Sequence, residues 1–250
     1  MRLDIFLVEN GYFNSRQKAQ NAIKDGAVSV NGKIVTKSNY ECVDFDDISI
    51  LKETNHYVSR GGYKLEAAIK EFYLDFKDKI ILDIGASTGG FTDCALKHGA
   101  KLVYAVDVGT DQLDDSLKNR SDVISYEQTN VLDIDSFDHE IDFIVMDVSF
   151  VSISKILPAI DKFLTDKNAF VCLVKPQFEV GKRFLKNGIV KDRTMHIKVL
   201  ENVKDALSFY NMGIEKMTVS PILGGSGNKE FLIYVKRNVN SKINIIEVCK

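Results

Sequence analysis

Apolar and polar residues alternate with two different periods along this chain. Short apolar runs predict strands, and the longer stretches between them have the three-to-four-residue spacing of helices that bury one face. Alternating strands and helices are typical of an α/β fold, so we predict a doubly wound, Rossmann-like and mostly parallel sheet. The predicted strands are Ile80–Ile84, Lys101–Asp107, Val123–Tyr126, Phe143–Met146, Phe170–Val174, Ile214–Val219 and Phe231–Val235, and the predicted helices are Tyr63–Phe72, Phe91–His98, Ser152–Leu164 and Thr194–Tyr210, whereas Lys236–Lys250 shows no clear pattern.

The first 52 residues have a different pattern, which predicts a separate small α+β module. Leu3–Glu9 and Ser15–Asp25 have helical spacing, and residues 46–51 can form a strand. Apolar residues alternate on both sides of Asn31-Gly32, and such a pair is the strongest short signal for a hairpin. We therefore expect a module at residues 1–52, a polar linker at residues 53–62 and a large domain at residues 63–250.

The segment that follows the first strand of the large domain predicts a nucleotide pocket. Leu82–Phe91 is a strand end that runs into a glycine-rich turn and then a helix. The spacing of Gly85 and Gly89 differs from the Gly-x-Gly-x-x-Gly of dinucleotide sites, and it suits S-adenosylmethionine, which has an adenosine but no phosphates. Asp83 can position the amino-acid end of this ligand, and Ser87, Phe91 and Asp147 are further candidates for cofactor binding. The alternative is a strand–glycine–helix junction that binds no ligand.

The next strand supports a cofactor. It ends at Asp107, which lies 22 positions after Gly85. In nucleotide-binding βαβ units an acidic residue about 20 positions after the first glycine binds the ribose hydroxyls. An NAD site would use the same carboxylate, so only the glycine spacing distinguishes the two ligands. Asn130, which follows the strand Val123–Tyr126, is a candidate contact for the adenine.

Two further predicted strands are followed by charged residues. Asp147 comes directly after Phe143–Met146, and Lys175 comes directly after Phe170–Val174. Because an ammonium group is costly to bury without a partner, and strand ends in this fold share one edge, Asp147 is the expected partner of Lys175. The pair is a candidate catalytic site or a structural salt bridge. Lys64, before the first strand, and Glu230, before the last one, are weaker candidates.

Composition excludes several classes of function. The net charge is −2, so the chain as a whole is not a basic nucleic-acid binder. The four cysteines form no Cys-x-x-Cys pair, so we expect neither a disulfide framework nor a metal site. No apolar run approaches the roughly 20 residues that span a bilayer, and the amino terminus lacks a signal-peptide core. A cytoplasmic location is therefore the expectation.

Positive charge is concentrated in two segments. Residues 1–37 carry six Lys/Arg against three Asp/Glu, and residues 172–198 carry seven against two. Such clusters can bind RNA phosphates, although a solvated surface is the alternative for any single side chain. The candidate RNA-binding residues are Arg2, Arg16, Lys18, Lys24 and Lys33 in the first segment, Lys182, Arg183 and Lys186 in the second, and Arg60 between them.

The motifs, taken in order, resemble two known families. Arg2-Leu3-Asp4, Ser15–Ala19 and Ile23–Gly32 together resemble the S4 RNA-binding domain. Residues 1–236 resemble the TlyA family of S4-domain rRNA methyltransferases, which are often labelled haemolysins and have an FtsJ-like catalytic domain. The segments that carry this second resemblance are Ser59–Leu65, Asp83–Phe91, Met146–Phe150, Val174–Glu179 and Gly224–Glu230.

The resemblance to TlyA implies an activity. It implies that S-adenosylmethionine is used to methylate a ribose 2′-hydroxyl, expected to be that of a cytidine, with ribosomal RNA or a ribosomal subunit as partner. FtsJ-like enzymes use a Lys-Asp-Lys-Glu tetrad, which falls here on Lys64, Asp147, Lys175 and Glu230. Lys175 would lie at the 2′-oxygen, as a neutral base or as a cation. A membrane-active haemolysin and an RNA-binding protein with an inactive methyltransferase domain are the competing hypotheses.

Overall fold

The computed structural model describes residues 1–13, 16–24, 26–43, 46–50, 56–224 and 227–250. The chain divides into two compact units, Met1–His56 and Tyr57–Lys250. Residues 57–62, which the sequence placed in the linker, belong to the second unit. The Tyr57 side chain is buried in the same apolar cluster as Leu65, and Gly61 begins the first helix of the unit. The second unit therefore starts before residue 63.

The first unit packs two helices on a small antiparallel sheet in which β1 lies between β2 and β3. Asn31 and Gly32 both have positive φ, 51° and 73°, as the tight turn between the first two strands requires. Leu3 and Leu7 of the first helix and Ile23 of the second are buried with Val28 and Val30 of the sheet. The elements are α1 (Leu3–Glu9), α2 (Arg16–Lys24), β1 (Val28–Val30), β2 (Lys33–Ile34) and β3 (Ile48–Ile50).

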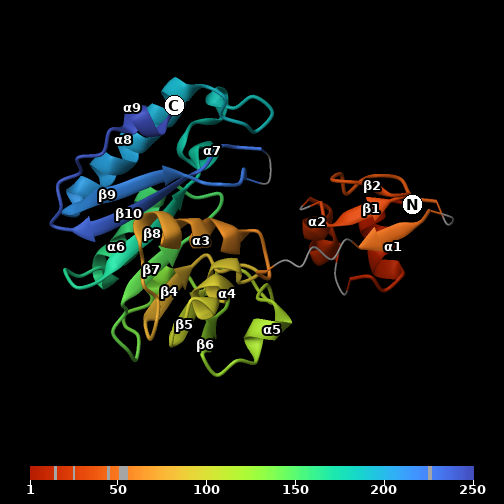
Figure 1. Cartoon of the computed structure of the whole chain (residues 1–250), viewed down its shortest axis with the longest axis horizontal. Helices are drawn as coiled ribbons and strands as arrows, with labels where there is room; N and C mark the ends of the chain where they lie inside the picture. Colours follow the sequence, from red (N-terminus) through yellow and green to blue (C-terminus); the bar gives the residue numbers. More distant parts are fainter. Residues whose placement is uncertain (14–15, 25, 44–45, 51–55, 225–226) are drawn as a thin grey trace. The chain divides into compact units, whose positions relative to one another are not determined.

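The second unit is built on a seven-stranded sheet with the order β6-β5-β4-β7-β8-β10-β9 (Figure 1). The strands from β6 to β8 run parallel, and β10 is antiparallel to both of its neighbours. The predicted doubly wound sheet is therefore confirmed. Its strands are β4 (Ile80–Ile84), β5 (Leu102–Val106), β6 (Val123–Tyr126), β7 (Phe143–Met146), β8 (Ala169–Val174), β9 (Met212–Val219) and β10 (Phe231–Arg237).

Helices cover both faces of this sheet. The helices α3 (Gly61–Phe72) and α4 (Gly90–Lys97) pack on one face, and α5 (Asp115–Lys118) packs on the same face near its edge. The opposite face is covered by α6 (Leu157–Phe163), α8 (Arg193–Phe209) and α9 (Ile245–Val248). Consecutive residues of the strands point to opposite faces, which is why the central strands β5, β7 and β8 are apolar along their whole length.

Two segments differ from the prediction. The expected helix Ser152–Leu164 is divided into a short 3₁₀ turn, η2 (Ile153–Lys155), and α6, which has Pro158 in its first turn. Proline has no backbone N–H and is tolerated only at the start of a helix, so a new helix begins there. Residues 236–250, which showed no pattern, extend β10 to Arg237 and form α9, a helix too short for a period to be recognised.

The strand order places a topological switch point at one edge of the sheet. From β4 the chain builds outward through β5 to β6, and it then returns to add β7 on the other side of β4. Ligands of open α/β sheets bind at this switch point, beyond the carboxyl ends of the strands. Within the described residues, no helix has the length and apolar character needed to cross a bilayer.

We predict that Gly213→Ala destabilises the second unit. Gly213 lies in β9, and a Cβ there would lie 1.8 Å from the Val239 carbonyl oxygen, a backbone atom that cannot rotate away. Overpacking of this kind costs about 1–3 kcal/mol of unfolding free energy, which urea denaturation measures. Gly181→Ala is the matched control, because a Cβ at that position meets no atom within 4 Å. Equal stability of the two variants would contradict the prediction.

Candidate active site

The loop between β4 and α4 lies at the switch point. Gly85 and Gly89 have φ values of 81° and 91°, which side-chain-bearing residues rarely adopt. A Cβ on Gly85 would lie 2.9 Å from the backbone oxygen of Asp147, so the missing side chain lets the ends of β4 and β7 approach each other. Ser87 also has a positive φ, 48°, and is exposed. The two glycines that the sequence singled out therefore shape the switch point.

Asp107 is fixed at the end of β5. Its Oδ2 accepts a hydrogen bond from the Ser87 N–H at 2.8 Å, and its Oδ1 accepts one from the Gly109 N–H at 2.7 Å. These backbone donors orient the carboxylate toward a small hollow beside the glycine loop. The hollow is lined by Ala86, Ser87, Ala105, Asp107, Gly109, Gln112, Leu113, Ser125 and Glu127.

Asp83 is fully buried in β4, two residues before Gly85. Its Oδ2 accepts a hydrogen bond from Thr92 Oγ1 at 2.6 Å, whereas its Oδ1 has no hydrogen-bond partner among the described residues. Burial, with a smaller contribution from the charges of Asp147 and Asp107, raises the pKa of Asp83 to about 7 against the opposing hydrogen bonds from Thr92. A buried carboxylate oxygen without a donor suits a ligand that carries a positive charge or N–H groups.

Two of the residues predicted to bind the cofactor have structural roles. The Phe91 side chain is 3% exposed and packs in the apolar cluster between the helices and the sheet, away from the hollow. The Asn130 side chain caps a 3₁₀ turn, η1 (Val131–Asp133), by accepting a hydrogen bond from the Leu132 N–H at 3.1 Å. Asn130 is nevertheless exposed beyond the end of β6.

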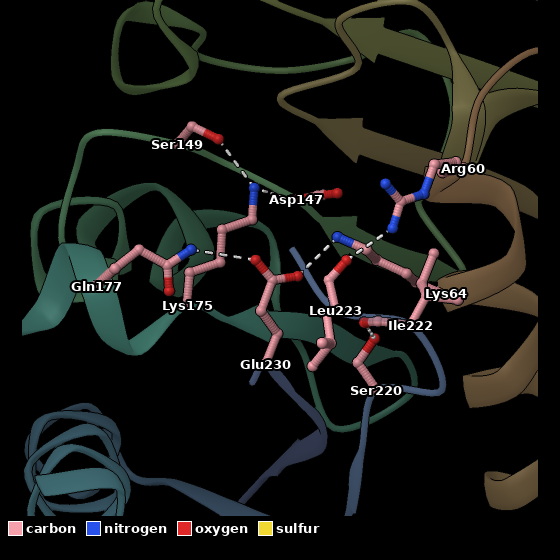
Figure 2. A network of polar contacts seen from close by, with 10 residues as sticks. All are labelled: Arg60, Lys64, Asp147, Ser149, Lys175, Gln177, Ser220, Ile222, Leu223 and Glu230. Atoms are coloured by element: carbon pink, nitrogen blue, oxygen red, sulfur yellow. Dashed lines mark hydrogen bonds and ion pairs between the residues drawn. The ribbon is translucent and has the colours of Figure 1, made fainter. Parts of the chain in front are cut away.

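The four residues of the predicted tetrad form two ion pairs at the same edge of the sheet (Figure 2). The Nζ of Lys175 lies 2.5 Å from Asp147 Oδ1, as the two strand ends predicted. The Nζ of Lys64 lies 2.6 Å from Glu230 Oε2, and these two side chains are only 10% and 2% exposed. Each buried lysine is thus matched by one carboxylate. No grouping of His, Cys, Asp and Glu in the described part of the chain could hold a metal ion.

Two polar side chains that the sequence did not single out complete this network. Ser149 Oγ accepts a hydrogen bond from Lys175 at 2.9 Å, and Gln177 Nε2 donates to Glu230 Oε1 at 3.1 Å (Figure 2). Gln177 lies on α7 (Pro176–Glu179), directly after Lys175. Ser149 lies two positions after Asp147, and Gln177 lies two positions after Lys175. This shared spacing from a charged residue that follows a strand is the signal that could have identified them.

The direction of β10 brings Glu230 to this edge. Phe231, its first residue, pairs with Val174, the last residue of β8, so Glu230 lies beside Lys175. A Cβ on Gly224 would lie 2.3 Å from Glu230 Oε1, so a glycine is needed where this loop passes the carboxylate. Arg60 Nη2 donates to the Leu223 backbone oxygen at 2.8 Å, which ties the start of α3 to the same loop (Figure 2).

The basic segment after α7 is anchored to the loop that carries Glu230. The buried side chain of Asn228 accepts a hydrogen bond from the Val190 N–H at 2.9 Å and donates to the Gly188 oxygen at 3.0 Å. Arg183, in η3 (Lys182–Phe184), stacks over the Phe184 ring, and Lys186 is exposed. The Lys182 side chain lies outside what the structure describes. The predicted basic surface thus adjoins the tetrad.

In the first unit, two of the predicted RNA-binding residues bind a buried carboxylate. Arg2 donates through Nε and Nη2 to Asp4 at 3.0 and 3.1 Å, and Arg16 donates through Nε at 2.9 Å. Arg2, Gln20 and Arg16 hold the pKa of Asp4 far below its ordinary value, although burial opposes this. Lys33 is exposed on β2. The side chains of Lys18 and Lys24 lie outside the described part of the structure.

Comparison with known proteins now identifies the family. Residues 57–237 match the FtsJ-like methyltransferase family, and residues 1–48 match the S4 domain. The chain belongs to the FtsJ-like methyltransferases. It also belongs to the TlyA group within them, because TlyA of Mycobacterium tuberculosis, named a 16S/23S rRNA (cytidine-2′-O)-methyltransferase, is 34% identical over 97% of this chain and 92% of its own length.

Other relatives extend over the same length. Hemolysin A of Brachyspira hyodysenteriae is 46% identical over 94% of this chain and 99% of its own. A solved structure from Streptococcus thermophilus, of a protein assigned as a hemolysin, is 41% identical and covers 100% of this chain and 94% of its own, with a TM-score of 0.79. The two-unit organisation is therefore shared with whole relatives rather than with fragments.

We predict that Asp83→Asn stabilises the ligand-free protein at pH 8 but not at pH 4. Because the pKa of Asp83 is raised to about 7, the folded state keeps a proton that the unfolded state releases near its ordinary pKa of about 3.9. Wild-type stability therefore falls as pH rises through this window, by an amount on the order of 4 kcal/mol at most. Asparagine removes that loss, and urea unfolding at several pH values measures it.

The control for this charge change is Asp135→Asn, since the Asp135 side chain is fully exposed. That variant should follow the wild-type pH dependence. The same stability difference between Asp83→Asn and the wild type at pH 4 and pH 8 would show that the carboxylate is ionised throughout, and the assignment of its raised pKa would be wrong.

Proposed function

We propose that this methyltransferase transfers a methyl group from S-adenosylmethionine to the ribose 2′-hydroxyl of a cytidine in ribosomal RNA. The observation that carries the proposal is the pair of lysine–carboxylate contacts, Lys175–Asp147 and Lys64–Glu230, beside a glycine loop at the switch point. The rRNA (cytidine-2′-O)-methyltransferase named TlyA in M. tuberculosis supports the choice of substrate. Ribosomal RNA as substrate also supports a cytoplasmic location.

The residues at the switch point fit S-adenosylmethionine, whose sulfonium makes its methyl group electrophilic when the cofactor is bound. Asp107, held by two backbone donors, can accept hydrogen bonds from the ribose hydroxyls of the adenosine. The free Oδ1 of Asp83 suits the ammonium group at the other end of the cofactor. Gly85 and Gly89 leave room for it against bare backbone. The acidic site and the cationic cofactor are thus complementary in charge.

Lys175 is the residue we place at the 2′-oxygen. An ammonium group has three N–H donors; Lys175 donates one to Ser149, and its charge is paired with Asp147. A remaining donor can reach a substrate oxygen and stabilise the negative charge that develops there, while the hydroxyl proton passes to solvent water. These contacts favour the cationic role of Lys175 over the neutral base. Because its partners fix its position in advance, little reorganisation is needed in the transition state.

Lys64 and Glu230 have the second role in this proposal. Both oxygens of Glu230 are engaged, one by Lys64 and the other by Gln177, so the carboxylate cannot turn toward Lys175. Lys64 is held beside Glu230 at the carboxyl edge of the sheet, where in this proposal it orients the target phosphate or ribose. The anchored basic segment with Arg183 and Lys186, and the S4 unit, would supply further contacts with the RNA backbone.

We expect Lys175→Ala to reduce the rate of methyl transfer by about 10²- to 10⁴-fold at saturating RNA and cofactor, because it removes a group that acts on the reacting oxygen. Cofactor affinity should stay within about twofold of wild type. Lys175→Arg should restore little activity, since the guanidinium differs in shape and cannot fit the same contacts. Single-turnover methylation of ribosomal RNA that lacks the modification measures the rate.

Lys79→Ala is the matched control. Lys79 is also paired with an aspartate, Asp142, but it lies at the amino end of β4, on the far edge of the sheet. Its loss should leave the rate unchanged. A near-normal rate for Lys175→Ala would show that the Lys175–Asp147 pair is structural and that the reaction takes place elsewhere.

Asp107→Ala should weaken the binding of S-adenosylmethionine by about 10- to 100-fold, because two hydrogen bonds to a charged acceptor would be lost. Isothermal titration calorimetry of the full chain measures the dissociation constant. Asp122→Ala is the control, since Asp122 precedes β6 at the opposite edge of the sheet and pairs with Arg120. Equal affinities of the two variants, or tighter binding of NAD than of S-adenosylmethionine, would refute the cofactor assignment.

A further inference from the structure

The S4 unit contains a buried carboxylate that gathers side chains from three places in the chain. Asp4, in the first turn of α1, has no exposed surface. Its oxygens accept hydrogen bonds from Arg2 Nε and Nη2, from Arg16 Nε at 2.9 Å and from Gln20 Nε2 at 2.6 Å. A carboxylate is costly to bury unless such donors compensate it, so the four contacts fix both guanidinium groups relative to the helices.

The charges in this cluster do not cancel. Two guanidinium groups meet one carboxylate, which leaves an excess of one positive charge. The side chains of Arg2 and Arg16 are 44% and 54% exposed, so the excess is presented to solvent. Each guanidinium has five N–H donors, and Asp4 accepts from two nitrogens of Arg2 and from one of Arg16. Donors that point outward therefore remain on two groups that cannot rotate freely.

We propose that Asp4 is a positioning residue that preorganises Arg2 and Arg16 as a pair of guanidinium forks for one phosphate of the RNA backbone. This inference rests on the proposed function, in which RNA is the substrate. A phosphate matches the planar fork of arginine through paired N–H···O bonds. Binding is stronger when the side chains are already ordered, since less rotamer entropy is lost on association. The surplus of Lys and Arg over residues 1–37 extends the same positive surface.

The substitution Asp4→Asn separates positioning from simple attraction, because the two effects have opposite signs. Asparagine removes a negative charge, so attraction alone would make RNA bind more tightly. A positioning role gives the opposite result, because asparagine offers one acceptor oxygen and an NH₂ group that cannot accept from an arginine. We expect Asp4→Asn in the full chain to bind a ribosomal RNA fragment about 5- to 10-fold more weakly than wild type, measured by filter binding at several salt concentrations.

Asp46→Asn is the matched control. Asp46 lies in the same unit and accepts hydrogen bonds from Asn31 Nδ2 at 2.8 Å and from the Val43 N–H at 3.0 Å, so the charge change is the same but no contact with an arginine is lost. This variant should bind RNA as tightly as wild type or slightly more tightly. Both variants should bind S-adenosylmethionine normally, and both should methylate at the wild-type rate when RNA is saturating.

Arg2→Lys tests the same inference independently, in case Asp4→Asn impairs folding. It keeps the buried carboxylate and the charge but replaces the fork by a single ammonium, and we expect about 3- to 10-fold weaker RNA binding. Wild-type or tighter binding by both Asp4→Asn and Arg2→Lys would overturn the inference. If the wild type binds RNA and both variants bind it equally well, the positioning role of Asp4 is refuted but the proposed function is not. A wild type that neither binds nor methylates ribosomal RNA would instead refute the proposed function.

Discussion

The ion pair between Lys64 and Glu230 constrains the architecture of the whole catalytic unit. Its two residues are 166 positions apart, their side chains are 10% and 2% exposed, and their charged atoms are 2.6 Å apart. Leaving either charge without its partner in such surroundings costs about 3–5 kcal/mol. The pair forms only if α3 packs at the start of the sheet and β10 enters it antiparallel. The ion pair can therefore form only in a chain that has folded with this arrangement of helix and strands.

Charge at the carboxyl edge of the sheet is graded from one side to the other. Around the glycine loop, Asp83 and Asp107 have no lysine partner among their described contacts, and their proximity to Asp147 contributes to the raised pKa of Asp83. On the other side, Lys175 and Lys64 each have a carboxylate partner. The acidic side suits a positively charged cofactor, whereas on the other side each lysine neutralises one carboxylate. The carboxyl edge of the sheet therefore changes from acidic to neutral along the strand order.

Much of the fold could be predicted from the sequence because the signals are local. The strands β4, β6 and β7 have the predicted bounds, since a buried strand is a continuous apolar run between polar residues. The glycine loop was recognisable for the same reason, because Gly85 and Gly89 adopt φ values that only glycine adopts readily. The pairing of Lys175 with Asp147 followed from two neighbouring strand ends. The sequence by itself therefore determined most of the strands, the glycine loop and one of the two lysine–carboxylate pairs.

Only the tertiary structure decided which distant residues meet, because such contacts depend on strand direction and on burial. Glu230 precedes its strand, so in a parallel sheet it would lie at the opposite edge from Lys175, and only the antiparallel pairing of Phe231 with Val174 brings it to the site. The pairing of Arg2 and Arg16 with Asp4 could not be predicted either, because the sequence does not show that the Asp4 carboxylate is buried beside them. Such contacts join residues distant in the chain, and their energies depend on desolvation, which no local pattern of residues records.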